Sequence, residues 1–329
     1  MGAGPARSAE LRIGGFPGRR DDVPARIGVL DLGTNTLSMT ALFGDVREPR
    51  RLRVAEELQF VTGLGKERAP DGSLSPDGMR RAWSALRHAS NRLAALGVPE
   101  RGIRGAATAA CREAPNGPEF LEHVRTGLGL PFQVIAGAEE ARLVALSQAR
   151  SFPDRLPLVA VDIGGGSTEV VVVEERGRIG WSRSIPFGAT KLATRVGQDH
   201  SEAQVRAAVR AVLDAEELPR GYGAVGVAGT VTAAVQVLDD AALWDPATQH
   251  GRTLTLEQTL RIARRLIAMP SAARHALPCV HPGRADALGP ALIWLAELMG
   301  DLGVEAVVTS DRGVRFGLLW DAWPGVVVL

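Results

Sequence analysis

The chain has 329 residues, a length typical of two domains or one large domain, and its 45% hydrophobic and 23% charged content is ordinary for a soluble globular protein. Its 38 basic and 37 acidic residues give a formal net charge of +1, which excludes a global basic field that would recruit nucleic acid or a membrane. Any anionic partner must therefore bind at a local site. The two cysteines, Cys111 and Cys279, form no CxxC pair, which argues against a disulfide framework or a thiolate metal site and suits a reducing cytoplasm.

The first 26 residues are rich in Gly, Pro, Arg and Ala and contain no apolar run, so they are predicted to form a flexible tail rather than a signal peptide. Apolar runs elsewhere are short and are broken by charges or turn residues, so none is expected to span a bilayer. The protein is therefore predicted to be soluble and cytoplasmic.

Two hairpins of the same plan occur far apart in the chain. The first is RIGVLDLGTNTLSMTALF at 26–43, and the second is LVAVDIGGGSTEVVVV at 159–174. Each has an apolar strand, an aspartate, a glycine-rich turn with hydroxyl groups and a second apolar strand. The matched aspartates are Asp31 and Asp162. This repeat predicts a duplicated fold with two lobes.

The segments between the hairpins alternate between helix and strand patterns. Residues 75–97 predict an amphipathic helix, with Ser75 as N-cap, Pro76 at the first helical position and Gly97 as the stop. Short strands in GIRGAAT and FQVIAG precede a helix in EEARLVALSQAR. Farther on, Ser201 and Thr255 begin capping boxes ahead of two helices, AVGVAG and EAVVTS predict strands, and ADALGPALIWLAELMG predicts a helix. This order indicates an α/β fold.

The glycine turns predict a metal–phosphate site. A turn without side chains lets backbone N–H groups approach phosphate oxygens, but Asp162 beside it would repel a bare phosphate. A Mg²⁺ ion between the two resolves this conflict. The hydroxyls of Thr34, Thr36 and Ser167 could donate to the same oxygens. One DIGGGST stretch alone fits a structural turn equally well, whereas two matched copies favour a phosphate clamp.

Five motifs, in this order and spacing, resemble those of the Ppx/GppA phosphatases, the exopolyphosphatases and guanosine pentaphosphate phosphohydrolases of the actin, Hsp70 and sugar-kinase (ASKHA) superfamily. They are DLGTNT, ATAACREAPN, GAEEARL, DIGGGSTE and AGTVTAA. The resemblance implies two actin-like (ribonuclease H-like) lobes with an active-site cleft between them. Lobe I would comprise 27–137 and 308–329, and lobe II would comprise 138–307. Longer members carry a C-terminal domain resembling an HD hydrolase, and this chain is expected to be a short form without it.

The same resemblance implies residue roles. Glu140 would be the general base for the attacking water, Arg112 would lie near the scissile phosphate, and Glu169 would help to hold the water. The metal ligands would be Asp31, Asp162 and Glu169. The phosphate-binding positions would be Gly33, Thr34, Asn35, Gly164, Gly165, Gly166, Ser167, Lys191, Gly229 and Thr230.

Simpler interpretations exist for some of these residues. Glu139 is interpreted as complementing a helix N-terminus, Lys191 could be a solvated surface lysine, and Arg112 could be a surface arginine that begins a helix. Ala138 and Phe316 replace residues usual in the family, which leaves the proposed catalytic set intact.

The expected activity is Mg²⁺-dependent hydrolysis of the terminal phosphate of inorganic polyphosphate. Aromatic residues make up 5% of the chain and form no motif suited to stacking guanine, which favours a linear phosphate polymer over a nucleotide. The alternatives are a guanosine pentaphosphate (pppGpp) phosphohydrolase and a polyphosphate:ADP phosphotransferase. A sensor of guanosine penta- or tetraphosphate without catalysis is disfavoured because it would need no base. No nucleic acid or membrane partner is expected, and a homodimer is left open.

Overall fold

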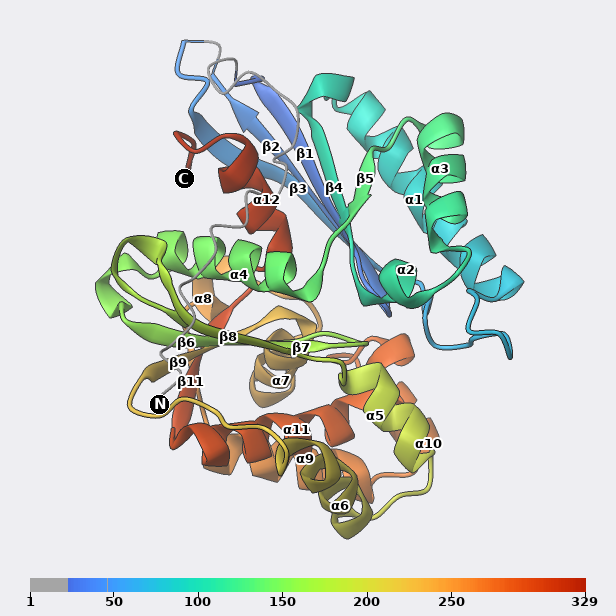
Figure 1. Cartoon of the computed structure of the whole chain (residues 1–329), viewed down its shortest axis with the longest axis vertical. Coiled ribbons are helices and arrows are strands. Elements are labelled where there is room, and N and C mark those ends of the chain that lie inside the picture. Colours follow the sequence, from blue (N-terminus) through green and yellow to red (C-terminus); the bar gives the residue numbers. More distant parts are fainter. Residues whose placement is uncertain (1–22, 46) are drawn as a thin grey trace, which may run out of the picture.

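Two six-stranded sheets form the frame of the molecule (Figure 1). The computed structural model describes residues 23–45 and 47–329, so most of the predicted tail at 1–26 lies outside the described residues. In the first sheet the strands lie in the order β12-β3-β2-β1-β4-β5, and in the second in the order β10-β11-β9-β6-β7-β8. The first set is β1 (Arg26–Leu32), β2 (Thr36–Gly44), β3 (Arg51–Val61), β4 (Ile103–Ala107), β5 (Phe132–Val134) and β12 (Val327–Val328). The second is β6 (Leu158–Ile163), β7 (Thr168–Val173), β8 (Ile179–Ile185), β9 (Gly223–Val227), β10 (Thr253–Thr255) and β11 (Ala306–Ser310).

Both sheets share one topology. In the first, β1, β2 and β3 form an antiparallel meander, and β4 and β5 extend it in parallel on the other side of β1. In the second, β6, β7 and β8 form the meander, and β9 and β11 are the parallel strands. The repeated hairpins thus begin two copies of the ribonuclease H-like arrangement, and the predicted actin-like fold class is confirmed. The sequence predicts that the chain returns to lobe I at residue 308. In the structure, β11 is still paired with β9 of the second sheet as far as Ser310.

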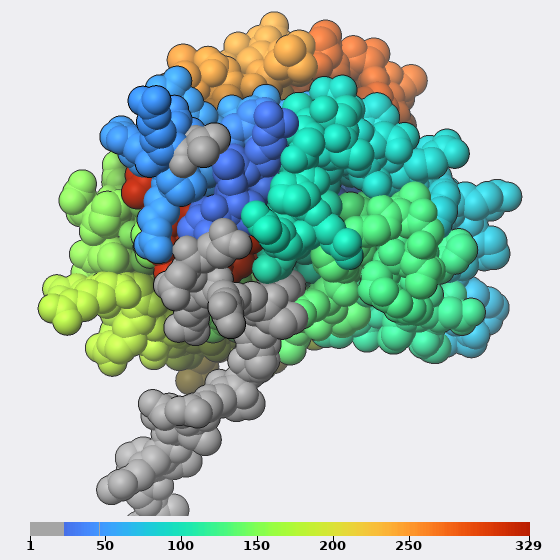
Figure 2. Space-filling model, turned by 90° about the horizontal axis from the view of Figure 1, so that it is seen from above, coloured from blue at the N-terminus to red at the C-terminus, as the bar shows by residue number. Residues whose placement is uncertain are grey.

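Helices cover both faces of each sheet. The first lobe carries α1 (Pro76–Ala95), α2 (Ala109–Glu113) and α3 (Gly117–Leu128), whereas α4 (Gly137–Ser151) and α12 (Val314–Ala322) lie between the two sheets (Figure 1). From above, the blue and cyan first lobe overlies the second, whose yellow-green and orange segments emerge beside it (Figure 2). The second lobe carries α5 (Ala189–Val196), α6 (Glu202–Leu213), α7 (Ala228–Asp239), α8 (Pro246–Gln249), α9 (Leu256–Ala268), α10 (Ser271–His275) and α11 (Ala285–Leu302).

The capping signals in the sequence mark real helix ends. Ser75 Oγ accepts a hydrogen bond from the Gly78 amide at 3.0 Å, and α1 ends just before Gly97, whose φ of +66° favours glycine. Both predicted capping boxes, at Ser201 and Thr255, are present. None of the helices formed by residues 23–45 and 47–329 is both long and apolar enough to cross a membrane.

The hydrophobic core has three parts. The outer face of the first sheet packs under α1 and α3, and the outer face of the second packs under helices that include α9 and α11. The third part fills the space between the lobes around α4 and α12, and both sheets contribute to it. Both cysteines are buried free thiols, as expected for core residues. The two lobes therefore share one inner core.

Candidate active site

Strand alternation places three of the predicted acids on the face between the lobes. In β1, Ile27 and Val29 belong to the shared inner core, and Asp31 is the next residue on that face. The same period places Asp162 on the face of Leu158 and Ala160 in β6. It also places Glu169 on the face of Val171 and Val173 in β7. Asp162 and Glu169 are register partners across the hairpin. The inner core thus ends in carboxylates where the two lobes meet.

The fourth acid, Glu140, comes from the first turn of α4. It is only 7% exposed, and its Oε2 lies 3.3 Å from Nη1 of Arg112 in α2. The same Nη1 donates to the carbonyl oxygen of Ile135 at 2.8 Å, which fixes the guanidinium beside the start of α4. The Arg112 side chain is therefore fixed by these two contacts and is not a solvated surface arginine. Glu139, by contrast, receives two hydrogen bonds from Arg142 at 2.7 Å and lies in the first turn of α4, the helix N-terminus at which the structural interpretation places it.

Burial and mutual repulsion hold protons on these acids more tightly than usual. Burial is the largest cause for all four and raises the pKa of Asp31 to about 6 and that of Glu169 to about 7. Burial also raises the pKa of Asp162 and of Glu140 well above their ordinary values, and the neighbouring Glu169 and Asp31 charges raise them further. The positive charge of Arg112 acts in the opposite direction and lowers the pKa of Glu140. The cluster is thus an electrostatically strained anionic site suited to a cation or to proton transfer.

The glycine turn between β6 and β7 is oriented by α5. The carbonyl oxygen of Gly164 accepts from the Ala189 amide at 2.9 Å, and that of Gly165 accepts from the Thr190 amide at 2.9 Å. Because the C=O and N–H of a trans peptide point in opposite directions, the amides of Gly165 and Gly166 point away from α5. Within residues 23–45 and 47–329 neither amide has a hydrogen-bond partner. Two backbone donors are therefore available to an anion.

The two glycine turns meet across the lobes. A Cβ atom on Gly166 would lie 2.4 Å from Oγ1 of Thr34 and 3.0 Å from the Ala109 Cβ, so only glycine allows this approach. A Cβ atom on Gly165 would lie 3.3 Å from that of Asn35. In the first turn, the Gly33 amide is already bonded to the Thr36 carbonyl oxygen at 2.8 Å. The two turns therefore face each other, with Thr34 and Asn35 next to the second turn.

The other predicted positions lie farther out. Lys191 in α5 forms an ion pair with Glu113 of α2, with Nζ 3.0 Å from Oε1, so it bridges the lobes at the edge of the site. The hydroxyl of Thr230 donates to the Ile163 carbonyl oxygen at 3.2 Å and is therefore engaged in holding α7 to β6. Gly229 is the second residue of α7, and its carbonyl oxygen accepts from Arg284 at 3.3 Å.

Arg284 and Ser184 are candidate site residues that sequence reasoning missed. Arg284 also donates to Oγ1 of Thr36 at 3.2 Å, so its guanidinium joins the two lobes, and burial lowers its pKa to about 10. It has no carboxylate partner among the residues that the structure describes. Ser184 in β8 donates to Oε1 of Glu169 at 2.8 Å and fixes that carboxylate. Arg284 lies far in sequence from the glycine motifs and Ser184 lies 15 residues after Glu169, and their neighbours HPGRAD and WSRS carry no local signal.

Residues 47–325 match the sequence model of the Ppx/GppA phosphatase family. The chain belongs to this family. Within it, exopolyphosphatase 2 of Mycobacterium tuberculosis is 29% identical over 315 residues, which cover 89% of this chain and 97% of that protein. The predicted family is confirmed, and the chain is a phosphatase.

Solved structures agree on the fold. A Ppx/GppA family member from Aquifex aeolicus is 25% identical with a TM-score of 0.72 and covers 89% of this chain and 96% of its own. An exopolyphosphatase from Cytophaga hutchinsonii is 22% identical with a TM-score of 0.77 and covers 92% of this chain and 99% of its own. The two-lobed architecture is therefore that of known Ppx/GppA proteins.

The acidic cluster of this Ppx/GppA protein fits a cation that is only partly held by protein. Oδ1 of Asp31 and Oε2 of Glu169 are buried without a hydrogen-bond partner, an arrangement that is costly for a carboxylate. Yet no group of three or more His, Cys, Asp or Glu side chains in the described ranges converges closely enough to hold a metal alone. Mg²⁺ commonly uses one or two carboxylates, with substrate phosphates and water completing its shell. The residues present match that mode.

Proposed function

We propose that the protein is a Mg²⁺-dependent exopolyphosphatase that hydrolyses the terminal phosphate of inorganic polyphosphate and releases orthophosphate. The observation that carries this proposal is that the buried carboxylate Glu140 lies close enough to Asp162 and Glu169 to be affected by their charges, and that these two acids flank a turn whose free amides, at Gly165 and Gly166, can bind an anion. Phosphatase activity itself follows from the family. The identity of the substrate and of the metal is the proposed part.

In the proposed reaction Glu140 is the general base. A raised pKa makes Glu140 a stronger base than an exposed carboxylate, provided that it is ionised when substrate is bound. It would take a proton from water as the water oxygen bonds to the terminal phosphorus and the bridging P–O bond breaks on the opposite side. The leaving chain keeps the bridging oxygen. Arg112, fixed by the Ile135 carbonyl oxygen, keeps Glu140 in place and has donors left for phosphate oxygens.

The amides of Gly165 and Gly166 would bind oxygens of the terminal phosphate, and the hydroxyl of Thr34 would face the same group. Asp162 and Glu169 would hold Mg²⁺, with Asp31 nearby on the other lobe. When bound, the ion neutralises phosphate charge and polarises the phosphoryl group. Ser184 keeps Glu169 oriented for this role.

A linear phosphate polymer suits the site because it needs only amide, hydroxyl and cationic contacts. The name of the M. tuberculosis relative, exopolyphosphatase 2, also supports polyphosphate as the substrate. Hydrolysis of pppGpp and transfer of the phosphoryl group to ADP use the same turns, and they remain the alternative outcomes of the test.

The test compares kcat/KM of the purified protein, with Mg²⁺, on tripolyphosphate, long-chain polyphosphate and pppGpp. We expect the highest value on a polyphosphate. A clear preference for pppGpp would replace the substrate assignment and leave the catalytic residues as proposed. Phosphoryl transfer to added ADP that outruns phosphate release would make the protein a phosphotransferase.

A further inference from the structure

Thr168 is the residue at which the glycine turn of the second lobe ends and β7 begins. Its side chain is fully buried, and its hydroxyl donates to the carbonyl oxygen of Phe187 at 2.8 Å. Phe187 immediately precedes Gly188, which caps the start of α5. The hydroxyl therefore joins the end of the glycine turn to the entry of the helix whose amides orient that turn.

The same hydroxyl is held from the other side by Trp294 of α11, a helix that packs against α5. The indole is fully buried, and its Nε1 lies 3.0 Å from Oγ1 of Thr168. Because an indole N–H can only donate, Oγ1 is its acceptor, and the single hydroxyl proton is directed to the Phe187 carbonyl oxygen. The Phe187 ring also packs against the indole, with the ring centroids 5.2 Å apart and the planes at 61°. These contacts fix the entry of α5 in one orientation.

The entry of α5 lies directly against the glycine turn. A Cβ atom on Gly188 would lie 2.5 Å from the Gly164 carbonyl oxygen and 2.9 Å from that of Gly165. These two carbonyl oxygens are also the acceptors of the α5 amides. A small displacement of Phe187 and Gly188 would therefore rotate both peptide planes of the turn. Because the amides of Gly165 and Gly166 belong to the same peptides, their direction would change as well.

Hydrophobic packing alone does not explain this arrangement. The hydrophobic effect is non-directional, so packing of α11 fixes how far it lies from β7 but does not fix the rotation of a peptide plane. A hydrogen bond is directional, since it weakens steeply as its angle departs from linear. The bonds from Trp294 to Thr168 and from Thr168 to Phe187 therefore supply an orientation that the surrounding core does not.

We propose that Trp294 and Thr168 are positioning residues of this phosphatase, which fix the direction of the phosphate-binding amides through the Phe187 carbonyl oxygen and α5. Both side chains are buried, and neither is proposed to touch the substrate. The inference rests on the proposed function, since it takes the amides of Gly165 and Gly166 as donors to the terminal phosphate. It adds that a residue 126 positions after Thr168 keeps those donors preorganised.

The experiment measures kcat/KM on tripolyphosphate with Mg²⁺ and, by calorimetric titration with Mg²⁺, the Kd of orthophosphate, a ligand of a single phosphate unit. Thr168→Val keeps the shape and removes the hydroxyl, and it should lower kcat/KM and raise the Kd by about tenfold each. Trp294→Phe removes the N–H donor and should change both values in the same direction by about threefold. Thr168→Ser keeps the hydroxyl and should restore both to within about twofold of wild type.

The matched control is Thr259→Val. Thr259 of α9 is equally buried, and its hydroxyl donates within the second lobe to the Thr255 carbonyl oxygen at 2.8 Å. This variant also loses one buried hydroxyl, so its unfolding temperature should fall. Its kcat/KM and orthophosphate Kd should stay at the wild-type values when they are measured well below the unfolding temperature.

Unchanged kcat/KM and Kd in Thr168→Val and Trp294→Phe would overturn the proposal, because the bonds would then serve only the stability of the core. So would a Thr168→Ser protein as impaired as Thr168→Val, or an equal loss in the Thr259 control. If Thr168→Val does not fold, Trp294→Phe decides alone.

The proposed function can fail separately. If the wild type prefers pppGpp or hydrolyses no polyphosphate, the substrate assignment fails, and the orthophosphate Kd of the variants still decides the positioning role. A wild-type protein that binds no orthophosphate would remove the anion-binding role of the turn and this inference with it.

Discussion

Glu140 is buried beside three other acids, and at the residue scale its position explains both its proposed basicity and its need for Arg112. We predict that Glu140→Gln lowers kcat by about 10²–10⁴-fold, because the amide cannot take the proton of the attacking water. Substrate binding should change little, as measured by equilibrium titration with tripolyphosphate.

Glu139→Gln is the matched control for this variant. Its carboxylate is bound by Arg142, which also pairs with Asp321 at 2.9 Å, so the change affects only local packing. We expect turnover close to wild type. Near-normal kcat in the Glu140 variant, or an equal loss in the Glu139 variant, would remove Glu140 from the role of base.

Asp286 shows how one residue makes stability depend on pH. Burial alone would raise its pKa, but hydrogen bonds from His275, Arg274 and Ser271 outweigh burial and lower the pKa from 3.8 to about 2. Because the folded pKa is the lower one, Asp286 contributes its stabilisation above about pH 4 and loses it as the pH falls toward 2.

We predict that Asp286→Asn lowers the free energy of unfolding by at most about 2 kcal/mol at neutral pH, since the carboxylate is partly exposed and screened. The difference from wild type should shrink between pH 4 and pH 2, as measured by urea denaturation at each pH. A difference that stays constant over this window would show that the ionised carboxylate is not its source.

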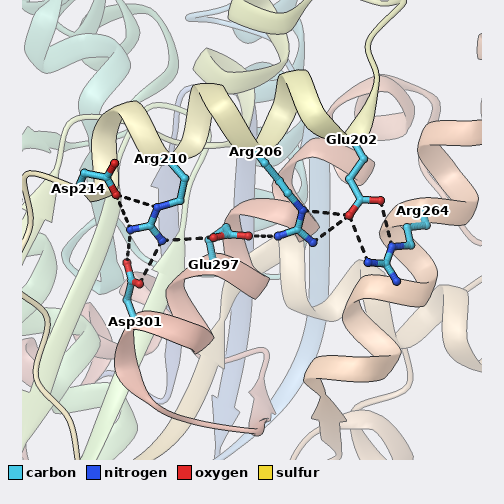
Figure 3. Close-up of polar contacts among 7 residues, drawn as sticks. All are labelled: Glu202, Arg206, Arg210, Asp214, Arg264, Glu297 and Asp301. Atoms are coloured by element: carbon cyan, nitrogen blue, oxygen red, sulfur yellow. Dashed lines mark hydrogen bonds and ion pairs between the residues drawn. The ribbon is translucent and has the colours of Figure 1, made fainter.

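At the element scale, an ion-pair network fastens α6 to α11 and α9 (Figure 3). Arg206 and Arg210 of α6 both donate to Glu297 of α11, and Arg210 also binds Asp301, with its Nη2 at 3.0 Å from Oδ2. Glu202 of α6 accepts from Arg206 and from Arg264 of α9. The central Glu297 side chain is 16% exposed, whereas the peripheral Asp214 side chain is 69% exposed.

We predict that Glu297→Gln destabilises the protein by about 1–3 kcal/mol, because it leaves two half-buried guanidinium groups with a weaker acceptor. Asp214→Asn removes an acid from the same Arg210, but at an exposed site, and should cost about 0.5 kcal/mol or less. Thermal unfolding at low and high salt compares the two. Equal losses would show that the buried Glu297 contributes no more to the stability of this network than the exposed Asp214 does.

At the scale of the whole molecule, the lobes share a core on one side and meet through polar groups at the site. The contacts Arg112–Glu140, Lys191–Glu113 and Arg284–Thr36 join residues that are 28, 78 and 248 positions apart in the chain. A substrate held by both glycine turns would therefore stabilise the closed pair of lobes.

We predict that tripolyphosphate with Mg²⁺ stabilises the Glu140→Gln protein by about 2.7 kcal/mol at a hundredfold excess over its Kd. Calorimetric unfolding measures this effect. EDTA should abolish most of it, and adding Asp162→Asn should shift the required Mg²⁺ to much higher concentration. Full stabilisation in EDTA would contradict a metal held by Asp162.

Features that depend on nearby residues were predictable. The hairpin repeat, the N-caps at Ser75, Ser201 and Thr255, and the glycine stop of α1 follow from periodicity and backbone preferences that act within a few residues. Strand alternation even fixes that Asp162 shares a face with Leu158 and Ala160, because side chains in a strand alternate whatever the rest of the chain does.

What only the tertiary structure decided is which distant groups meet. Sequence motifs gave no indication that Arg284 would join Gly229 to Thr36, that Ser184 would hold Glu169, or that Glu113 would occupy Lys191. The Arg284–Thr36 and Glu113–Lys191 contacts depend on the packing of the two lobes, and the Ser184–Glu169 contact depends on the register of β7 and β8. A charged side chain carries no local mark of its partner, because Coulomb attraction depends on distance in space and not along the chain. The sequence alone therefore determined the elements and the chemistry of the turns, and the packing of the lobes determined which charges compose the site.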